Sequence, residues 1–230
     1  SNVLYLADDA NNKIYKASKP TGITNSPQGL AYDGTNLYIL VDGAQKDHIV
    51  VVNPGSGTVV RDFAAPSRGA YSITYLNSFL YVAAAEEIPG QPPMRTITKI
   101  SPVDGAVQAG NVSVPGEFQG KITGLSNDGS SLIGTQDQGM FAVFMNPTNG
   151  TFQKRVDFYD TPYSDGFDSL AFYATSNDLF TTKGGKVLRF DDDGRGLGEF
   201  NTTLTNLMGS VFVSELLYLA EATNNTIQAA

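Results

Sequence analysis

A pattern that returns at intervals of about 45 residues constrains the fold of this chain more than any other feature of its sequence. The clearest copy begins at Gly29 with Gly-Leu-Ala-Tyr-Asp-Gly-Thr-Asn-Leu-Tyr-Ile-Leu and continues, after a polar break, with the apolar segment that starts at His48. Looser copies begin near Ser72, Ile122, Ser169 and Ser210. Because each copy is a run of short apolar segments separated by Gly, Asn, Asp and Pro, one copy cannot bury both of its faces and must pack against neighbouring copies.

Period-two alternation of apolar and polar residues predicts four strands in the clearest copy, over residues 29–33, 36–41, 48–53 and 58–63. The last two strands are joined by Pro54-Gly55-Ser56-Gly57, a turn that places Gly where a positive φ is favourable. Turns of this kind recur at the same phase in later copies, at residues 102–105, 147–150 and 191–194. No segment carries a sustained apolar stripe of helical period.

Four antiparallel strands per copy describe one blade of a β-propeller. We therefore expect an all-β protein in which residues 1–230 form a single propeller domain of four-stranded antiparallel blades. Six blades account best for the number of strands, and a closed five-bladed ring is the alternative. The ends make the count ambiguous, because Val3–Ile14 matches Leu216–Ile227 and both segments have the pattern of the second and third strands of a blade. The same redundancy fits a fragment of a longer chain.

Composition restricts the classes of partner. The chain has 15 Lys and Arg against 23 Asp and Glu, and its basic residues are scattered, which argues against nucleic acid because phosphate binding needs clustered cations. There is no cysteine, so disulfides and thiolate chemistry are excluded. No apolar run approaches the roughly 20 residues that span a bilayer, so we expect no membrane insertion. We expect a secreted or cell-surface protein, with a cytoplasmic location as the alternative.

Acidic residues concentrate in the connections that would form one face of such a propeller. That face is built by the connections between second and third strands and by those between blades. We expect it to bind a protein or a small-molecule ligand through carboxylates that are distant along the chain, namely Asp8, Asp42, Glu86, Asp137, Asp165, Asp168 and Glu221. A ring of carboxylates attracts a hard cation such as Ca²⁺, and it also favours a basic partner. The alternative is that these residues only solubilise exposed loops.

Other features have simpler interpretations. Asp191-Asp192-Asp193-Gly194 has part of the spacing of a calcium loop, but Arg189 occupies the earlier ligand position, so we expect a hairpin turn. The single histidine, His48, is expected at the surface end of a strand, because no nucleophile motif accompanies it. Aromatic residues at strand positions, such as Tyr38, are expected to pack between blades. The Pro-rich insertion over residues 86–94 is expected to protrude from the ligand face.

The repeat also has a family resemblance. Three segments carry it: Ala7-Asp8-Asp9-Ala10-Asn11-Asn12-Lys13-Ile14, Gln28-Gly29-Leu30-Ala31-Tyr32, and Asp168-Ser169-Leu170-Ala171-Phe172 with the strands that follow. They resemble the repeats of NHL- and YVTN-type propellers and of gluconolactonase-like propellers. Gluconolactonase-like enzymes hold a divalent metal with Glu, Asn and Asp at the starts of inner strands. The resemblance places Asp168 at the position of the Asp and Gln28 at that of the Asn, whereas the segment that carries the Glu has no counterpart here.

These observations favour a non-enzymatic propeller that acts as a binding or scaffold module. The alternative is a metal-dependent hydrolase, lactonase or lyase of gluconolactonase-like type, with Asp168 and Gln28 as metal ligands and Ca²⁺ as the candidate cofactor. No residue is assigned a catalytic role. A metal held by three or more protein oxygens at the centre of the ring would favour the enzyme.

Overall fold

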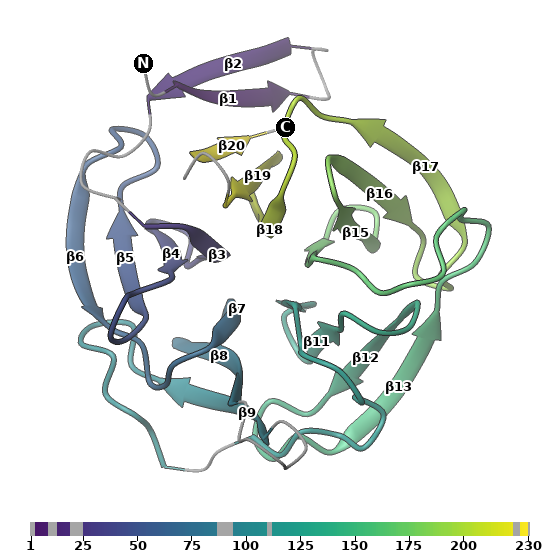
Figure 1. Cartoon of the computed structure of the whole chain (residues 1–230), viewed down its shortest axis with the longest axis horizontal. Coiled ribbons are helices and arrows are strands. Elements are labelled where there is room, and N and C mark those ends of the chain that lie inside the picture. The colour runs from purple at the N-terminus through teal and green to yellow at the C-terminus, as the bar shows by residue number, and fades with distance from the viewer. Residues whose placement is uncertain are drawn as a thin grey trace.

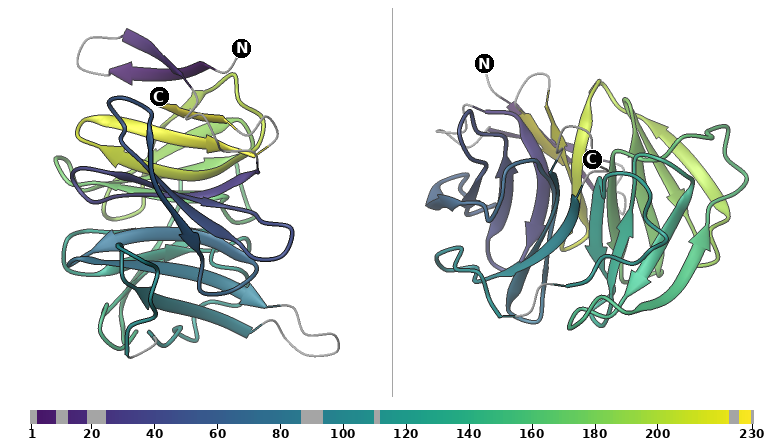
Figure 2. Two further views of the ribbon diagram at one scale, coloured as in Figure 1. Left: turned by 90° about the vertical axis from the view of Figure 1, so that its left-hand side faces the viewer. Right: turned by 60° about the horizontal axis from the view of Figure 1, so that its bottom comes forward.

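The computed structural model describes residues 3–8, 13–18, 25–86, 94–109, 112–222 and 226–229, and every regular element within these ranges is a β-strand. The strands form antiparallel sheets arranged around a common axis (Figure 1). Side views show the sheets packed face to face, with their connections gathered at the two ends of the ring (Figure 2). The all-β propeller predicted from the repeat is therefore confirmed. These ranges contain no helix of the length and apolar character needed to cross a membrane.

Three of the described sheets have four strands, which follow one another in chain order. The first contains β3 (Pro27–Tyr32), β4 (Leu37–Val41), β5 (His48–Val52) and β6 (Val59–Ala64). The second contains β10 (Gly124–Asn127), β11 (Leu132–Thr135), β12 (Phe141–Met145) and β13 (Phe152–Asp157). The third contains β14 (Ser169–Tyr173), β15 (Asp178–Lys183), β16 (Lys186–Phe190) and β17 (Gly196–Asn201). The strands of the first sheet begin and end within about two residues of the predicted ones.

Two further sheets have three described strands each. One contains β7 (Ala70–Leu76), β8 (Phe79–Glu86) and β9 (Met94–Ile100), and the other contains β18 (Leu207–Val213), β19 (Leu216–Glu221) and β20 (Thr226–Ala229). Only isolated bridges, Ile97 to Val112 and Ile100 to Val107, occupy the fourth position beside β9. The strands β1 (Val3–Asp8) and β2 (Lys13–Ser18) form a separate hairpin that contacts β19 and β20 at the outside of the ring (Figure 1). In the described part of the chain, four strands are thus present in three of the sheets and three strands in two others.

The innermost strands of the five sheets form a closed cycle in the described part of the chain. Strand β3 contacts β7, β7 contacts β10, β10 contacts β14, β14 contacts β18, and β18 contacts β3. The strands β18 and β3 approach so closely that a Cβ on Gly209 would lie 2.8 Å from the Cα of Gly29. This contact leaves no place for another inner strand between them. The six-blade count is therefore not confirmed, and the described strands have the arrangement of the five-bladed alternative.

Apolar residues fill the space between each pair of neighbouring sheets. Five separate buried clusters are present among the described residues, and each draws its members from two adjacent sheets. Tyr38 and Tyr75 stack between the first sheet and the β7–β9 sheet, with ring centroids 6.3 Å apart. Phe158 and Phe190 pack between the next two four-stranded sheets at 4.4 Å. The predicted packing of aromatic residues between blades is confirmed.

The turns between third and fourth strands also agree with the sequence pattern. Their glycines have left-handed φ angles, 70° at Gly57, 73° at Gly105, 75° at Gly150 and 90° at Gly194, which other residues adopt with strain. In the last of these turns Asp191 Oδ1 accepts the backbone N–H of Arg195 at 2.8 Å, so the hairpin interpretation of the Asp-rich segment is confirmed. His48 begins β5 as expected, half-exposed, with Nδ1 3.1 Å from Oδ1 of Asp62.

Candidate functional site on the top face

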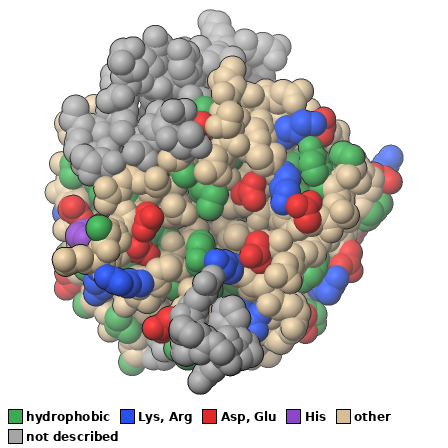
Figure 3. All heavy atoms as spheres, in the orientation of Figure 1, with side chains coloured by type: hydrophobic (Ala, Val, Ile, Leu, Met, Phe, Trp, Pro, Cys, Tyr) green, Lys and Arg blue, Asp and Glu red, His purple; other side chains and the backbone are tan. Residues whose placement is uncertain are grey.

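One end of the ring, which we call the top face, is shown in Figure 3. It is formed by the connections between second and third strands and by those that lead from one sheet to the next, because antiparallel strands bring these connections to the same end. Of the predicted ligands, the structure places the following in these connections or at the strand ends beside them: Asp42, Glu86, Asp137, Asp165, Asp168 and Glu221. The Asp8 side chain and residues 87–93 of the Pro-rich insertion lie outside the described part of the structure.

The buried acids of the top face accept hydrogen bonds from neighbouring backbone. Glu221 ends β19 and is only 2% exposed, and its Oε1 accepts the backbone N–H of Thr205 at 3.1 Å. Asp47, which is 4% exposed, accepts the backbone N–H of Ala70 through Oδ2 at 2.9 Å. Each of these bonds joins a connection within a blade to the segment that leads into an inner strand. Glu221 was expected to lie in an open rim of carboxylates. It is buried instead, and its carboxylate accepts a backbone hydrogen bond that holds two segments together.

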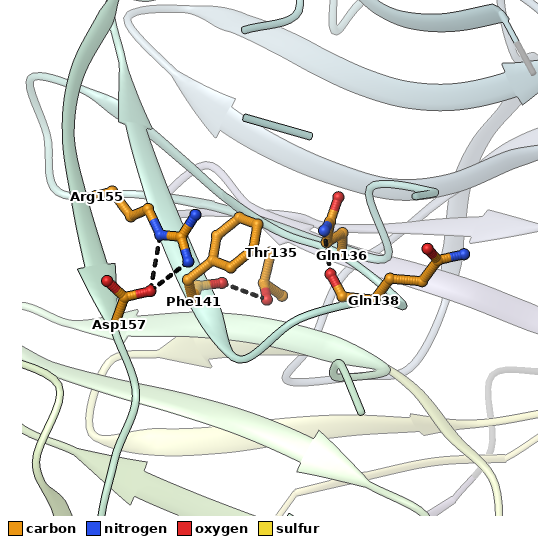
Figure 4. Close-up of polar contacts among 6 residues, drawn as sticks. All are labelled: Thr135, Gln136, Gln138, Phe141, Arg155 and Asp157. Atoms are coloured by element: carbon orange, nitrogen blue, oxygen red, sulfur yellow. Dashed lines mark hydrogen bonds and ion pairs between the residues drawn. The ribbon is translucent and has the colours of Figure 1, made fainter. Parts of the chain in front are cut away.

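The turn between β11 and β12 is held by contacts among its own residues (Figure 4). The hydroxyl of Thr135 donates to the backbone oxygen of Phe141 at 2.9 Å, and the amide of Gln136 donates to the backbone oxygen of Gln138. The guanidinium of Arg155 lies over the Phe141 ring, 3.9 Å from its centroid. These contacts fix the position of the turn that carries Asp137.

Asp137 joins this turn to the segment that precedes β10. Its Oδ1 accepts the backbone N–H of Lys121 at 2.8 Å, and its own backbone N–H donates to the Lys121 backbone oxygen at 3.1 Å. The Lys121 ammonium lies 4.8 Å from the centroid of the Tyr71 ring, a cation–π contact that reaches the neighbouring sheet. Asp137 is thus a half-buried residue whose hydrogen bonds to Lys121 join two connections of the top face.

Asp168 immediately precedes β14, the inner strand of the third four-stranded sheet. Its Oδ2 accepts the backbone N–H of Gly184 at 2.9 Å, and Oδ1 has no hydrogen-bond partner among the described residues. Burial raises the pKa of the Asp168 carboxyl and the charge of Asp165 adds to the increase, although the Gly184 hydrogen bond and the charge of Lys183 oppose it. Asp168 is therefore a half-buried carboxylate with one open oxygen at the start of an inner strand.

Lys183 supplies the positive charge beside Asp168. It ends β15, and its ammonium donates to the backbone oxygen of Gly166 at 2.8 Å and lies 2.9 Å from Oδ2 of Asp165. The Lys183 side chain is 23% exposed, whereas that of Asp165 is 70% exposed. Sequence reasoning did not select Lys183 as a site residue. The available signal was the Lys183-Gly184-Gly185 turn, which the pairing of Ser169 with Thr182 brings opposite Asp168.

The remaining predicted ligands are spread over other blades. Asp42 and Glu86 are exposed on the first sheet and on the β7–β9 sheet. Around the middle of the top face, acidic side chains are interspersed with Lys and Arg side chains, so the visible surface is not a continuous acidic ring (Figure 3). Beside Asp168 the described charges include one opposite-charge pair, Lys183 with Asp165.

The two residues predicted to bind metal occupy matching places on different inner strands. Gln28 lies at a β-bulge at the start of β3, between Pro27 and Gly29, as Asp168 lies just before β14. Strand β18 lies between β3 and β14 in the cycle of inner strands. Within the described ranges no group of three or more His, Cys, Asp and Glu side chains is arranged to hold a metal ion.

Comparisons with known proteins identify the fold alone. The sequence matches no protein-family model and no curated protein. The structure is similar to the crystal structure of glutaminyl cyclase from Myxococcus xanthus, with a TM-score of 0.68 and 14% sequence identity over 92% of each chain. It is also similar to a chain in the crystal structure of a mitotic checkpoint complex, with a TM-score of 0.50 and 11% identity over 100% of this chain and 71% of that one. At these identities the likeness supports a β-propeller and carries no residue roles.

Proposed function

We propose that this chain is a non-enzymatic β-propeller binding module that holds a small polar ligand at Asp168 and Lys183 on the top face. The main support is the Asp168 carboxylate, in which Gly184 fixes Oδ2 while Oδ1 lacks a partner among the described residues. Because a carboxylate oxygen accepts hydrogen bonds, Oδ1 can receive one from a donor on the ligand.

Lys183 indicates that the ligand also carries a hydrogen-bond acceptor. An ammonium group has three N–H donors, and the described contacts of Lys183 use two of them, to Gly166 and to Asp165. A ligand that donates to Asp168 and accepts from Lys183 satisfies both groups. A primary ammonium next to a carbonyl has this pattern, so we propose ligands that resemble the amino-terminal residue of a peptide.

NMR titration with glycinamide tests this proposal, because glycinamide carries an ammonium next to an amide. N-acetylglycinamide, which lacks the ammonium, is the matched control ligand. We expect glycinamide to shift the backbone amide signals of Asp168, Lys183 and Gly184, and to lose this effect in the Asp168→Asn variant. Asp42→Asn is the control variant, because it also removes one negative charge but at an exposed residue away from Asp168. It should bind as the parent does. Equal shifts in the parent and in Asp168→Asn would contradict the proposal.

A second candidate function is catalysis at the same carboxylate. Carboxyls with pKa values raised by burial are typical of general acids and bases, and Asp168 has such a shift. One similar solved structure is a glutaminyl cyclase, so cyclisation of an amino-terminal glutaminyl residue is the reaction to examine first. Incubation with a peptide that begins with Gln should release ammonia if this candidate holds. No release above that of Asp168→Asn would exclude it.

The metal-dependent lactonase is an alternative that rests on the sequence resemblance. It requires Asp168 and Gln28 to act together with further oxygen ligands, and the described residues contain no ready cluster of three carboxylate or imidazole groups. Lactone hydrolysis measured with and without Ca²⁺ tests it. Calcium-dependent acid release that is lost in both Asp168→Ala and Gln28→Ala would favour the enzyme over the binding module.

A further inference from the structure

A cavity of about 240 Å³ opens on the face opposite the top face, between the second and third four-stranded sheets. We call it the inter-blade pocket, and its lining residues are Asp128, Ser130, Phe144, Lys154, Phe172, Asn177, Leu179 and Asp192. Pockets for drug-sized ligands measure roughly 300–1,000 Å³, so this one suits a smaller molecule. It is separate from Asp168, which lies at the other end of β14.

The floor of the inter-blade pocket is apolar and preformed. Leu179 is fully buried and Phe144 is almost so, and the half-buried Phe172 is the aromatic residue with a part exposed to a ligand. The two sheets are tied together beside the pocket, because the backbone N–H of Phe172 in β14 donates to the hydroxyl of Ser126 in β10 at 3.0 Å. A ligand therefore meets the exposed part of the Phe172 ring, which this hydrogen bond holds in place.

The rim of the pocket carries both acceptors and donors. Asp128 Oδ1 accepts hydrogen bonds from Ser130 and Ser131, which leaves Oδ2 without a partner in the described structure. Neither the Asp192 carboxylate nor the Asn177 amide makes a side-chain hydrogen bond to another described residue. The Lys154 ammonium is likewise not hydrogen-bonded there and lies over the Phe144 ring, 4.2 Å from its centroid. Four polar groups of both hydrogen-bonding types thus surround the apolar floor.

This mixture of groups discriminates between ligand classes. An organic cation would be repelled by the Lys154 ammonium, which lies over the face of the Phe144 ring. An anion would meet two carboxylates, Asp128 and Asp192, against one ammonium. Hydroxyl groups donate and accept at once, so they can bond to a carboxylate and to an amide or ammonium together. A molecule with many hydroxyls and an apolar C–H face matches both the rim and the floor.

We propose that the inter-blade pocket binds a neutral sugar ring, with Asp128, Asn177, Asp192 and Lys154 contacting its hydroxyls and Phe172 packing against its C–H face. The ring is held between two blades on the face opposite Asp168. The site therefore does not depend on the proposed function of the top face, and Asp168→Asn should leave it unchanged.

The test is NMR titration of the whole chain with a panel of neutral methyl glycosides of glucose, galactose, mannose, xylose, fucose and N-acetylglucosamine. We expect at least one of them to shift the amide signals of residues 128–130 and 177–179 with saturable, millimolar binding. Lys154→Met keeps the apolar stem but removes the donor, and Asn177→Gly keeps the left-handed turn (φ 60°) but removes the amide. Each variant should weaken binding by about tenfold or more.

The control variant is Asp193→Asn, which makes the same charge change as Asp192→Asn in the same turn but does not line the pocket. It should bind as the parent does, whereas Asp192→Asn should bind more weakly. Absence of shifts with every glycoside would overturn the proposal. So would shifts that persist in Lys154→Met and Asn177→Gly, or a pocket that responds to butylammonium or glucuronate and not to the neutral sugars.

Discussion

Gly209 in β18 packs directly against Gly29 in β3, so closely that a Cβ on Gly209 would lie 2.8 Å from the Cα of Gly29. The same close approach recurs in β10, where a Cβ on Gly124 would lie 2.6 Å from the backbone nitrogen of Leu170 in β14. Contacts this short do not occur between real Cβ atoms and backbone. Glycine at these positions therefore allows inner strands of neighbouring sheets to meet and the ring to close.

Substitution of Gly209 by Ala should destabilise the protein by about 1–3 kcal/mol, because the added methyl group forces two backbones apart. For a chain of this length each kcal/mol corresponds to a decrease in Tm of about 2–4 °C. Gly116→Ala is the matched control, since a Cβ there would meet nothing within 4 Å and the φ angle is not left-handed. Thermal unfolding followed by circular dichroism measures both. Equal Tm values for the two variants would show that the strands do not meet as described.

Asp47→Ala should be destabilising by about 1–3 kcal/mol, because it leaves the buried N–H of Ala70 without an acceptor. Asp42→Ala removes the same charge from the same connection, but Asp42 is exposed, so its effect should stay within about 0.5 kcal/mol. Urea denaturation gives both values, and hydrogen exchange should show faster exchange at Ala70 only in the first variant. A loss of stability that is no larger for Asp47→Ala than for Asp42→Ala would refute the structural role of Asp47.

Asp168 should make the stability of the parent decrease as the pH rises. Burial raises the pKa of its carboxyl above 3.8, so between the unfolded and folded pKa values the folded protein binds more protons than the unfolded chain, and stability falls through that window. Asp168→Asn removes this titration but keeps an acceptor for Gly184. The variant should therefore gain stability relative to the parent as the pH rises through the window, and the gain should be absent below it.

Asp165→Asn is the comparison variant, because the pKa of Asp165 is shifted in the opposite direction to that of Asp168. The hydrogen bond from Lys183 lowers the pKa of Asp165, so the stabilisation by this carboxylate is present above 3.8 and is lost as the pH falls. Urea denaturation of both variants and the parent at pH 3 and pH 7 separates the two cases. If Asp168→Asn were less stable than the parent at neutral pH and not in acid, the carboxylate would be stabilising and the argument for an open oxygen would fail.

Tyr38→Phe should cost about 1.5–3 kcal/mol near neutral pH, because the buried Tyr38 hydroxyl donates to Oδ2 of Asp33 at 2.7 Å. Burial alone would raise the pKa of Asp33, but hydrogen bonds from Asn36, Tyr38 and Thr35 outweigh it and lower the pKa. The variant should shift the Asp33 pKa upward, as read from the carboxyl carbon signal in NMR. Its stability deficit should shrink as the pH falls through that pKa, since a protonated Asp33 gains less from the hydroxyl.

Tyr81→Phe is the control for this pair. Tyr81 is as buried as Tyr38, but its hydroxyl makes no hydrogen bond to another described residue, and burial alone raises its pKa. The loss of stability should be smaller than for Tyr38→Phe and should not depend on pH between 3 and 7. A similar deficit for both variants would mean that the bond to Asp33 contributes nothing.

The local structure could be predicted because it depends on neighbours in the sequence. The short apolar runs Leu37–Val41 and His48–Val52, together with the glycines at the turns, were sufficient to predict these strands of the first sheet and its hairpins, since short apolar runs and positive φ angles are local properties. The clustering of acidic connections at one end also follows from strand direction. The number of blades does not, because it rests on a contact between Gly29 and Gly209, which are far apart in the chain.

For the carboxylates, too, some properties could be predicted from the sequence and others depend on tertiary contacts. The sequence by itself determined the repeat, the all-β class and the end of the ring on which Asp137, Asp168 and Glu221 lie. Only the tertiary structure decided that Glu221 is buried against Thr205 and that Asp168 keeps an open oxygen beside Lys183. The physical reason is that an acidic residue in a loop has the same local pattern whether it faces water or accepts a backbone N–H, and the donors come from segments that only folding brings within reach.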